Sequence, residues 1–377
     1  MSIATVGKRA FARMAVGLLK RNIMLESFLR WGEKQVLNEL VIRNEHDRPI
    51  GSQQEKFIVV QNLMRSFERK LKSGALSPSV RDWVFNTLIS DVMLSWRDRH
   101  ADAFCRRQQN EPIPNFITIS PTQKCNLACI GCYAASSNKT AVTLGWDVVD
   151  RIMEQKRELW GSYFTVISGG EPLMYQSQGK TILDLYEKHH DNFFLMYTNG
   201  TLIDRAMAKK LASLGNVAPA ISVEGFEDET DYRRGKGVYR KILEAVEYLK
   251  EEGVIYGISF TATRKNVDRL PSDPFIDQFF GPYGASFGWM FQYMPMGRGV
   301  DFELMITPEQ RRQLWHQERH LIHEKRVCFF DFWNGGPISD GCISAGRKGG
   351  YLYIDWHGNV MPCVFVPYTV GNIKKDF

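Results

Sequence analysis

Residues 116–133 of this 377-residue chain read FITISPTQKCNLACIGCY. A β-rich run at 116–120 leads into a loop that carries Cys125, Cys129 and Cys132. Three thiolates on one short loop can hold three corners of a cubane iron–sulfur cluster and leave the fourth iron without a protein ligand, open to chemistry. A structural zinc site, or simply three buried thiols, would use the same residues. The cysteines alone therefore do not decide between a cluster and a zinc site.

Four further motifs follow in order along the chain, each at the end of a strand-like run. Each motif is weak by itself, because a lone Gly-Gly-Glu or Ser-x-Glu-Gly often occurs by chance. Their shared position, at the carboxyl end of an expected strand, is where parallel α/β folds carry functional residues. The motifs are Gly169-Gly170-Glu171-Pro172, Thr198-Asn199-Gly200, Ser222-Val223-Glu224-Gly225 and the basic, glycine-rich turn 231–237, which contains Arg234.

In these motifs and in its C-x3-C-x2-C spacing, the sequence resembles the radical S-adenosylmethionine (SAM) superfamily. The resemblance implies that a [4Fe–4S] cluster on Cys125, Cys129 and Cys132 reductively cleaves SAM to a 5′-deoxyadenosyl radical, which abstracts hydrogen from a substrate. It also implies an electron donor such as flavodoxin or ferredoxin. The alternative is a non-catalytic iron–sulfur or zinc-binding protein, which would not turn SAM over.

The resemblance also implies which residues contact SAM. Glycines let the backbone approach a ligand closely, and a carboxylate and carbonyl groups can accept from an ammonium, so the 169–172 turn would receive the amino group. Acceptors on Ser222 and Glu224 suit the ribose hydroxyls, and the Arg234 guanidinium suits the SAM carboxylate. The implied contacts are Gly169, Gly170, Glu171, Pro172, Ser222, Glu224 and Arg234, with Tyr133 at the adenine.

One position departs from the family pattern. Family members commonly carry an aromatic residue just before the third cysteine, near the adenine. Here that position holds Gly131, and the nearest aromatic residue is Tyr133. Tyr133 is therefore the residue to which we assign the adenine contact, whereas cluster binding does not depend on this position.

The chain is expected to adopt an α/β fold, because strand-like and helical runs alternate after residue 116. Such alternation produces right-handed βαβ units and a parallel sheet. Six strands match the partial (βα)6 barrel of radical SAM enzymes. We expect an α-helical N-terminal region at 1–110, a core barrel at 111–305 and a small β-hairpin iron–sulfur extension at 306–377. The expected strands are 116–120, 163–168, 193–198, 218–223, 256–263 and 287–294, and the expected helices are 144–159, 180–190, 202–214, 239–252 and 307–325.

The C-terminal region resembles the start of a SPASM or twitch extension, which carries auxiliary iron–sulfur clusters. The resemblance covers an opening cysteine, a hairpin with its turn at 356–359, a Pro-Cys pair and the run 371–373. Complete modules hold more cysteines, so this version is truncated or minimal. Its candidate ligands, Cys342 and Cys363 with Cys328 as a third, cannot complete a four-cysteine site. A zinc site and buried thiols are the alternatives.

The composition is that of a globular protein in a reducing compartment. Apolar residues make up 44% of the chain and charged residues 24%, and no run approaches the roughly 20 apolar residues of a membrane span. Seven cysteines, clustered at motif spacings without a signal peptide, indicate metal ligation in the cytoplasm rather than disulfides. The basic excess lies in 1–110, outside the core barrel, and we expect no nucleic-acid partner.

The first 23 residues carry five basic side chains and no acidic one, and apolar residues such as Phe11 and Leu18 can form an opposite face. Such a segment can lie on an anionic membrane surface or dock a partner, and the alternative is a helix packed on the barrel. By family frequency the expected substrate is a peptide or another natural product. Peripheral contact with a membrane would favour the alternative substrate, a lipid chain.

Overall fold

The computed structural model describes residues 25–44, 47–87, 113–139, 142–344, 346–347 and 350–375. The basic segment 1–23 lies outside the described residues, so its membrane-surface role stays a prediction. Within the described part of the chain, no helix combines the length and the apolar character needed to cross a membrane.

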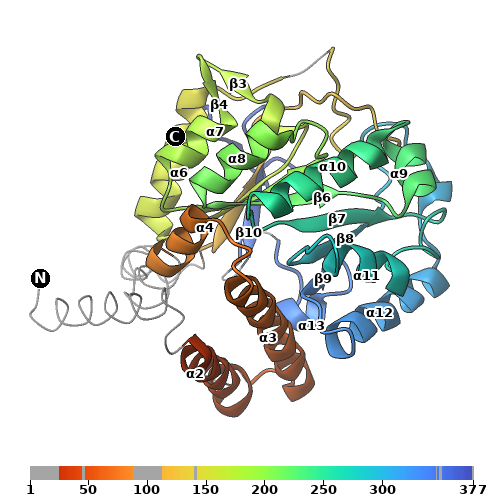
Figure 1. Ribbon diagram of the computed structural model, residues 1–377. Helices are drawn as coiled ribbons and strands as arrows, with labels where there is room; N and C mark the ends of the chain where they lie inside the picture. Colours follow the sequence, from red (N-terminus) through yellow and green to blue (C-terminus); the bar gives the residue numbers. More distant parts are fainter. Residues whose placement is uncertain are drawn as a thin grey trace, which may run out of the picture.

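A large sheet forms the centre of the molecule (Figure 1). Its strands are β1 Phe116–Ile119, β2 Phe164–Ile167, β5 Phe193–Thr198, β6 Val217–Ser222, β7 Gly257–Ala262, β8 Gly288–Gln292, β9 Phe329–Asp331, β10 Tyr351–Ile354, β11 Asn359–Met361 and β12 Gly371–Asn372. Within the described residues the strand order is β12-β11-β10-β1-β2-β5-β6-β7-β8-β9. Neighbours from β1 to β8 pair in parallel, which confirms the predicted α/β fold.

Helices connect these strands, and Figure 1 shows α6, α7, α8 and α10 together on one side of them. The helices and short turns are α6 Trp146–Trp160, η3 Pro172–Met174, α7 Ile182–Lys188, α8 Arg205–Leu214, α9 Glu227–Arg234, α10 Val238–Glu251, α11 Asp273–Phe280, η4 Phe302–Leu304, α12 Pro308–His323 and α13 Gly336–Ser339, with a small hairpin of β3 Gln176–Ser177 and β4 Lys180–Thr181 before α7. Helix α9 corrects the sequence prediction, because the expected turn 231–237 begins inside it. Six of its eight residues are charged, so no apolar period marks it as a helix.

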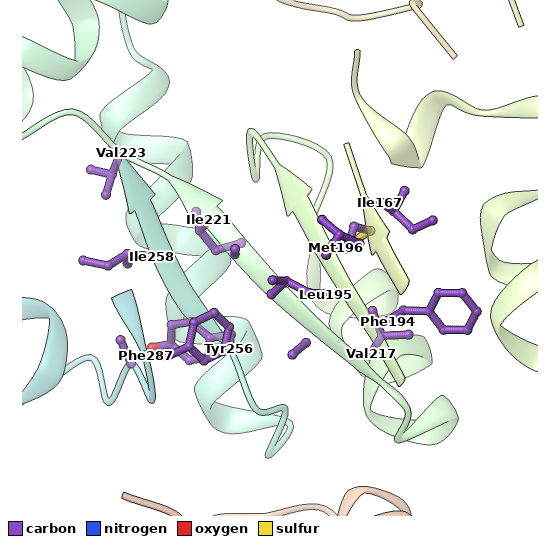
Figure 2. Packing of buried hydrophobic residues seen from close by; sticks show 14 of the residues in the cluster. Ile167, Phe194, Leu195, Met196, Val217, Ile221, Val223, Tyr256, Ile258 and Phe287 are labelled. Carbon is purple, nitrogen blue, oxygen red and sulfur yellow. The ribbon is translucent and has the colours of Figure 1, made fainter. Parts of the chain in front are cut away.

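Apolar side chains fill the space between the sheet and the helices (Figure 2). Phe194, Met196, Ile221 and Ile258, from three neighbouring strands, are fully buried there. Successive side chains of a strand point to opposite faces of the sheet. Leu195 therefore faces the other side, where it lines a cavity.

The described N-terminal segments are helical, and the longest of them, at 50–72, packs against the C-terminal region (Figure 1). They comprise α2 Leu25–Leu37, the π-helical turn η1 Asn38–Arg43, α3 Ile50–Lys72 and α4 Pro78–Trp83. On α3, the buried Asn62 amide donates to the Ile322 carbonyl at 2.9 Å and to the Val327 carbonyl at 3.1 Å. Lys56 forms an ion pair of 2.7 Å with Asp340, just after α13. Helix α3 is thereby fixed to both α12 and α13.

The C-terminal strands extend the sheet on both edges instead of forming a separate layer. Strand β9 pairs in parallel with β8, and β10 pairs in parallel with β1 at the opposite edge. The connection between β9 and β10 therefore joins opposite edges of the sheet. The expected hairpin is present, since β10 and β11 pair antiparallel.

Candidate active site

A cavity of about 360 Å³ lies inside the curve of the sheet. Strands β1 and β8, which four other strands separate in the sheet order, both contribute to its wall, so the sheet bends around it. Most residues that the sequence assigns to SAM or to the cluster line this one cavity. They are Cys125, Cys129, Cys132, Tyr133, Gly169, Gly170, Ser222 and Arg234.

Cys125, Cys129 and Cys132 occupy the loop that follows β1. Burial raises the pKa of Cys125 to about 11, so this thiol becomes a thiolate when a metal group replaces its proton. Its sulfur accepts from the Leu127 amide at 3.4 Å, a contact that suits a thiolate. Among the described residues, no three His, Cys, Asp or Glu side chains gather as ligands of one metal ion. The three cysteines line the wall of one cavity.

The Gly169–Gly170 turn packs closely against the beginning of the cysteine loop. The Gly170 amide donates to the Thr122 carbonyl at 2.9 Å, and the Glu171 amide donates to the Lys124 carbonyl at 2.8 Å. A Cβ atom on Gly170 would lie 2.1 Å from the Lys124 carbonyl oxygen, and Gly169 has a φ of 105°. Glycine is therefore required at both positions for the turn to join the loop.

Glu171 is fully buried and does not line the cavity. Its carboxylate accepts from the Thr198 hydroxyl at 2.7 Å, from the Asn199 amide at 2.8 Å and from the Leu173 amide at 3.2 Å. Burial raises the pKa of this carboxyl group, and the three donors partly oppose the rise. The carboxylate thus fastens the turn to the end of β5, while buried Pro172 begins η3. Contact of either side chain with SAM stays a prediction.

Glu224 is also fully buried, and it pairs with both Arg233 and Arg234. One oxygen accepts from Arg234 Nε at 2.9 Å, and the other accepts from the Thr261 amide at 2.9 Å. Arg233 and Arg234 line the cavity, whereas Glu224 does not. Glu224 therefore positions the two arginines, and its direct contact with the ribose stays a prediction.

Two cavity residues on later strands were not predicted from the sequence. The Ser259 hydroxyl on β7 lies 3.3 Å from that of Ser222, so two hydroxyls stand side by side in the cavity wall. Tyr293, just after β8, packs on Gly131 so closely that a Cβ atom there would lie 2.4 Å from its ring. A glycine at a position where the family commonly has an aromatic residue was the signal that could have prompted a search for a replacement ring.

Two further contacts hold the cysteine loop. The Tyr133 hydroxyl accepts from the Gly169 amide at 3.1 Å, and burial raises the pKa of this tyrosine, which keeps it neutral. The Arg298 amide donates to the Cys132 carbonyl at 2.9 Å, and its guanidinium reaches the Cys129 carbonyl at 3.4 Å. Arg298 lies 169 residues from Cys129 in the chain, and nothing in the sequence signals the contact.

The three C-terminal cysteines occupy different surroundings. Cys328 lies in the main core, where burial raises its pKa to about 12. Cys363 is buried in a smaller cluster and accepts from the Tyr351 hydroxyl at 3.1 Å. Cys342 is exposed. In the part of the chain that the structure describes, these sulfurs do not form a three-ligand group, and an auxiliary cluster stays a prediction.

Known proteins share both sequence and fold with this chain. A model of the radical SAM superfamily matches residues 119–264. Mycofactocin maturase MftC of Mycolicibacterium smegmatis is 34% identical over 281 residues, covering 70% of this chain and 68% of MftC. Fe-coproporphyrin III synthase of Methanosarcina barkeri is 33% identical over 162 residues, covering 41% of this chain and 39% of the synthase. SuiB of Streptococcus suis bound to SAM matches with a TM-score of 0.57 at 15% identity, over 86% of this chain and 80% of SuiB.

The fold and the cavity define an α/β enzyme whose polar and thiol groups gather at the carboxyl ends of parallel strands. The chain belongs to the radical SAM superfamily, because it is 34% identical to MftC over more than two thirds of both proteins and the family model matches from the last residue of β1 through β7. Membership implies that it is an enzyme with a [4Fe–4S] cluster and SAM as cofactors.

Proposed function

We propose that this radical SAM enzyme modifies a peptide, or a related natural product, by abstracting hydrogen from it. The observation that carries the proposal is one cavity that unites the cysteine loop, the glycine turn and an extended apolar wall. Two comparisons support a peptide substrate. MftC is named a maturase, and SuiB has also been solved with the precursor peptide SuiA bound.

Cys125, Cys129 and Cys132 would hold the cluster, which supplies the electron and the open iron that SAM cleavage requires. The Gly169–Gly170 turn would present its carbonyl groups to the SAM amino group. Glu171 would either accept from that amino group directly or keep the turn in place from behind. Its bonds to the end of β5 support the second role.

The other end of SAM would lie against β6 and β7. The Ser222 and Ser259 hydroxyls suit the ribose, and Arg234 suits the carboxylate with Glu224 behind it. Tyr133 stays the proposed adenine contact. Because aromatic and apolar groups make up much of the cavity wall, they would keep water away from the reacting atoms.

Anaerobic reconstitution with iron and sulfide, followed by reduction with dithionite in the presence of SAM, tests the enzyme assignment. The native chain should release 5′-deoxyadenosine, and Cys125→Ala should not, because it removes one cluster ligand. Cys105→Ala, which changes a cysteine outside the motif, is the matched control and should retain the activity. Nucleoside release from the native chain no higher than from Cys125→Ala would refute the proposal.

The peptide substrate has its own test. A short peptide encoded beside the gene, incubated with the reduced enzyme and SAM, should change in mass, and mass spectrometry detects the change. SAM cleavage with an unchanged peptide, combined with modification of acyl chains in added vesicles, would favour the lipid alternative.

Three remaining parts of the proposal concern partners and a second cluster. Flavodoxin or ferredoxin would deliver the electron in the cytoplasm, and either should replace dithionite in the assay.

Deletion of residues 1–23 should abolish co-sedimentation with anionic vesicles if this segment contacts a membrane. Iron analysis addresses the auxiliary cluster on Cys342 and Cys363, since about four irons per chain support one cluster and about eight support two.

A further inference from the structure

Four hydroxyl groups form a hydrogen-bonded network beside the glycine turn that follows β2. The Tyr353 hydroxyl on β10 donates to Ser120 Oγ at 2.8 Å, and Ser120 Oγ lies 3.1 Å from Ser168 Oγ. Ser168 also forms a hydrogen bond with the Tyr133 hydroxyl, which accepts from the Gly169 amide at 3.1 Å. The network therefore joins the C-terminal hairpin to the turn that the proposed function assigns to SAM.

Ser120, in the middle of this network, supports the turn directly. Its amide donates to the Ile354 carbonyl of β10 at 2.8 Å, which fixes its backbone to the C-terminal hairpin. Gly169 packs against the Ser120 side chain so closely that a Cβ atom on the glycine would lie 2.7 Å from Ser120 Cβ. No space separates the serine from the turn, so a movement of this side chain would displace the turn.

Packing alone does not require hydroxyl groups at these positions. Tyr353 is 3% exposed and Ser120 is 0% exposed, and phenylalanine and alanine would fill nearly the same space. A buried hydroxyl is costly unless it is hydrogen-bonded, whereas a fully bonded network holds its members in one arrangement. Neither residue belongs to the described residues that line the cavity. An influence of Tyr353 or Ser120 on SAM therefore passes through the turn.

We infer that Tyr353 is a positioning residue for SAM, because its hydroxyl holds Ser120 in the orientation that supports the Gly169–Gly170 turn. The inference rests on the proposed role of that turn, and it adds a residue of the C-terminal hairpin to the SAM site. Without the hydroxyl, Ser120 loses a hydrogen-bond donor and the turn loses a fixed support. SAM must then order the turn as it binds, which reduces its affinity.

Calorimetric titration of the unreduced, cluster-loaded enzyme with SAM tests this role. Tyr353→Phe removes only the hydroxyl and should raise the Kd for SAM about three- to tenfold, the usual effect of one hydrogen bond, at unchanged iron content. Ser120→Ala should also raise the Kd, and the double variant should match Ser120→Ala, because Tyr353 acts through Ser120. Tyr256→Phe is the matched control. Its buried hydroxyl donates to the Tyr283 carbonyl outside the described cavity wall, so the Kd should stay as in the native chain.

An unchanged Kd in Tyr353→Phe would overturn this role, and so would separate effects of the two substitutions that multiply in the double variant. Thermal unfolding shows whether each variant folds. If Tyr353→Phe does not fold, Ser120→Ala decides, and a native Kd in that variant contradicts the inference.

Hydrogen exchange separates this inference from the proposed function. SAM should slow exchange in peptides that cover 169–174 of the native chain, because the turn is ordered by the ligand. Absence of this protection counts against the proposed contact between the turn and SAM. Protection of the turn combined with equal SAM affinity in Tyr353→Phe counts against the role of Tyr353 alone.

Discussion

Ser222 and Glu224 stand two residues apart at the end of β6, yet their surroundings differ. The Ser222 hydroxyl lines the cavity beside Ser259. Glu224 is fully buried behind Arg233 and Arg234, whose side chains are each 11% exposed. A change at Ser222 should therefore affect a ligand, while a change at Glu224 should affect the folded structure first.

Ser222→Ala and Glu224→Gln should separate the two roles. Ser222→Ala should raise the Kd for SAM about three- to tenfold, the effect of one lost hydrogen bond, at nearly unchanged stability. Glu224→Gln leaves two buried guanidinium groups without a counter-charge and should lower the free energy of unfolding by about 3–5 kcal/mol. Calorimetric titration with SAM and denaturant unfolding provide the two readouts. Reduced SAM affinity at full stability in Glu224→Gln would instead indicate direct contact with the ribose.

Arg298 brings a positive charge to the carbonyl groups of the cysteine loop, reaching both Cys129 and Ser136. A nearby cation stabilises the reduced, more negative state of a cluster. Arg298→Met should therefore make the reduction potential more negative by an amount on the order of tens of millivolts. A redox titration followed by electron paramagnetic resonance measures the shift. Arg205→Met, on α8 and paired with Glu251, is the control, and an equal potential in both variants would contradict the prediction.

At the scale of elements, the parallel strands were predictable because each is a short apolar run between helical segments. Strand β6, for example, is buried along almost its whole length, as expected for a strand covered on both faces. Helix α9 was not predictable in this way. Its charged residues form contacts such as the Arg234–Glu224 pair, and they do not produce an apolar face. The periodicity of apolar residues detects helices that pack on the core. It does not detect a helix whose residues mainly contact one another and the cavity.

Glu318 is a buried acid between α12 and β9. It is 1% exposed and accepts from the Asp331 amide at 3.2 Å. Burial, and then the charge of Asp331, raise the pKa of Glu318 from 4.5 to about 8. Between these pH values the folded chain holds a proton that the unfolded chain has released. Its stabilising contribution is therefore complete below pH 4.5 and is lost as the pH rises through about 8.

Glu318→Gln should remove this pH dependence, because an amide does not titrate. From pH 6 to pH 9 the free energy of unfolding of the native chain should fall by roughly 2–3 kcal/mol relative to that of the variant. Urea unfolding of both proteins at pH 6 and pH 9 measures this change in the free energy of unfolding. The difference between the two proteins removes the pH-dependent contributions of titrating groups that both contain. One of these is Lys156, because burial lowers its pKa to about 7. A difference that stays constant with pH would show that Glu318 ionises normally.

At the scale of the whole molecule, the C-terminal region completes the cavity. Its strands join opposite edges of the sheet, and the crossing segment brings Phe332 and Ile343 to the cavity wall. The sequence predicted the hairpin, because turn chemistry and alternation are local. It did not predict which strands β9 and β10 would pair with, since both pairings depend on tertiary packing, and that of β10 with β1 joins residues more than two hundred positions apart. The gathering of Tyr197, Phe291, Phe332 and Phe365 along the cavity was also beyond prediction, because these rings come from distant segments of the chain.

Helix α3 stabilises this crossing segment from outside the sheet. Lys56 pairs with Asp340 at 2.7 Å, and Gln53 donates to the same carboxylate at 3.1 Å. Both side chains of the ion pair are about four-fifths buried, at 20% and 23% exposure, so the pair is shielded from solvent. Loss of the pair should therefore loosen residues 332–344 and, with them, part of the cavity wall.

Lys56→Met keeps the aliphatic stem and the helix propensity but removes the charge, and it should lower the free energy of unfolding by about 1 kcal/mol. Hydrogen exchange followed by mass spectrometry should become faster in peptides from 332–344, while β5 and β6 keep their protection, because the loss is local. Lys209→Met, at an exposed position of α8, makes the same chemical change without an ion pair to Asp340 and should leave the exchange pattern as it is. Equal acceleration across the whole sheet would mean that Lys56 contributes only to global stability. Faster exchange confined to the crossing segment would instead show that an N-terminal helix controls how firmly the cavity is closed.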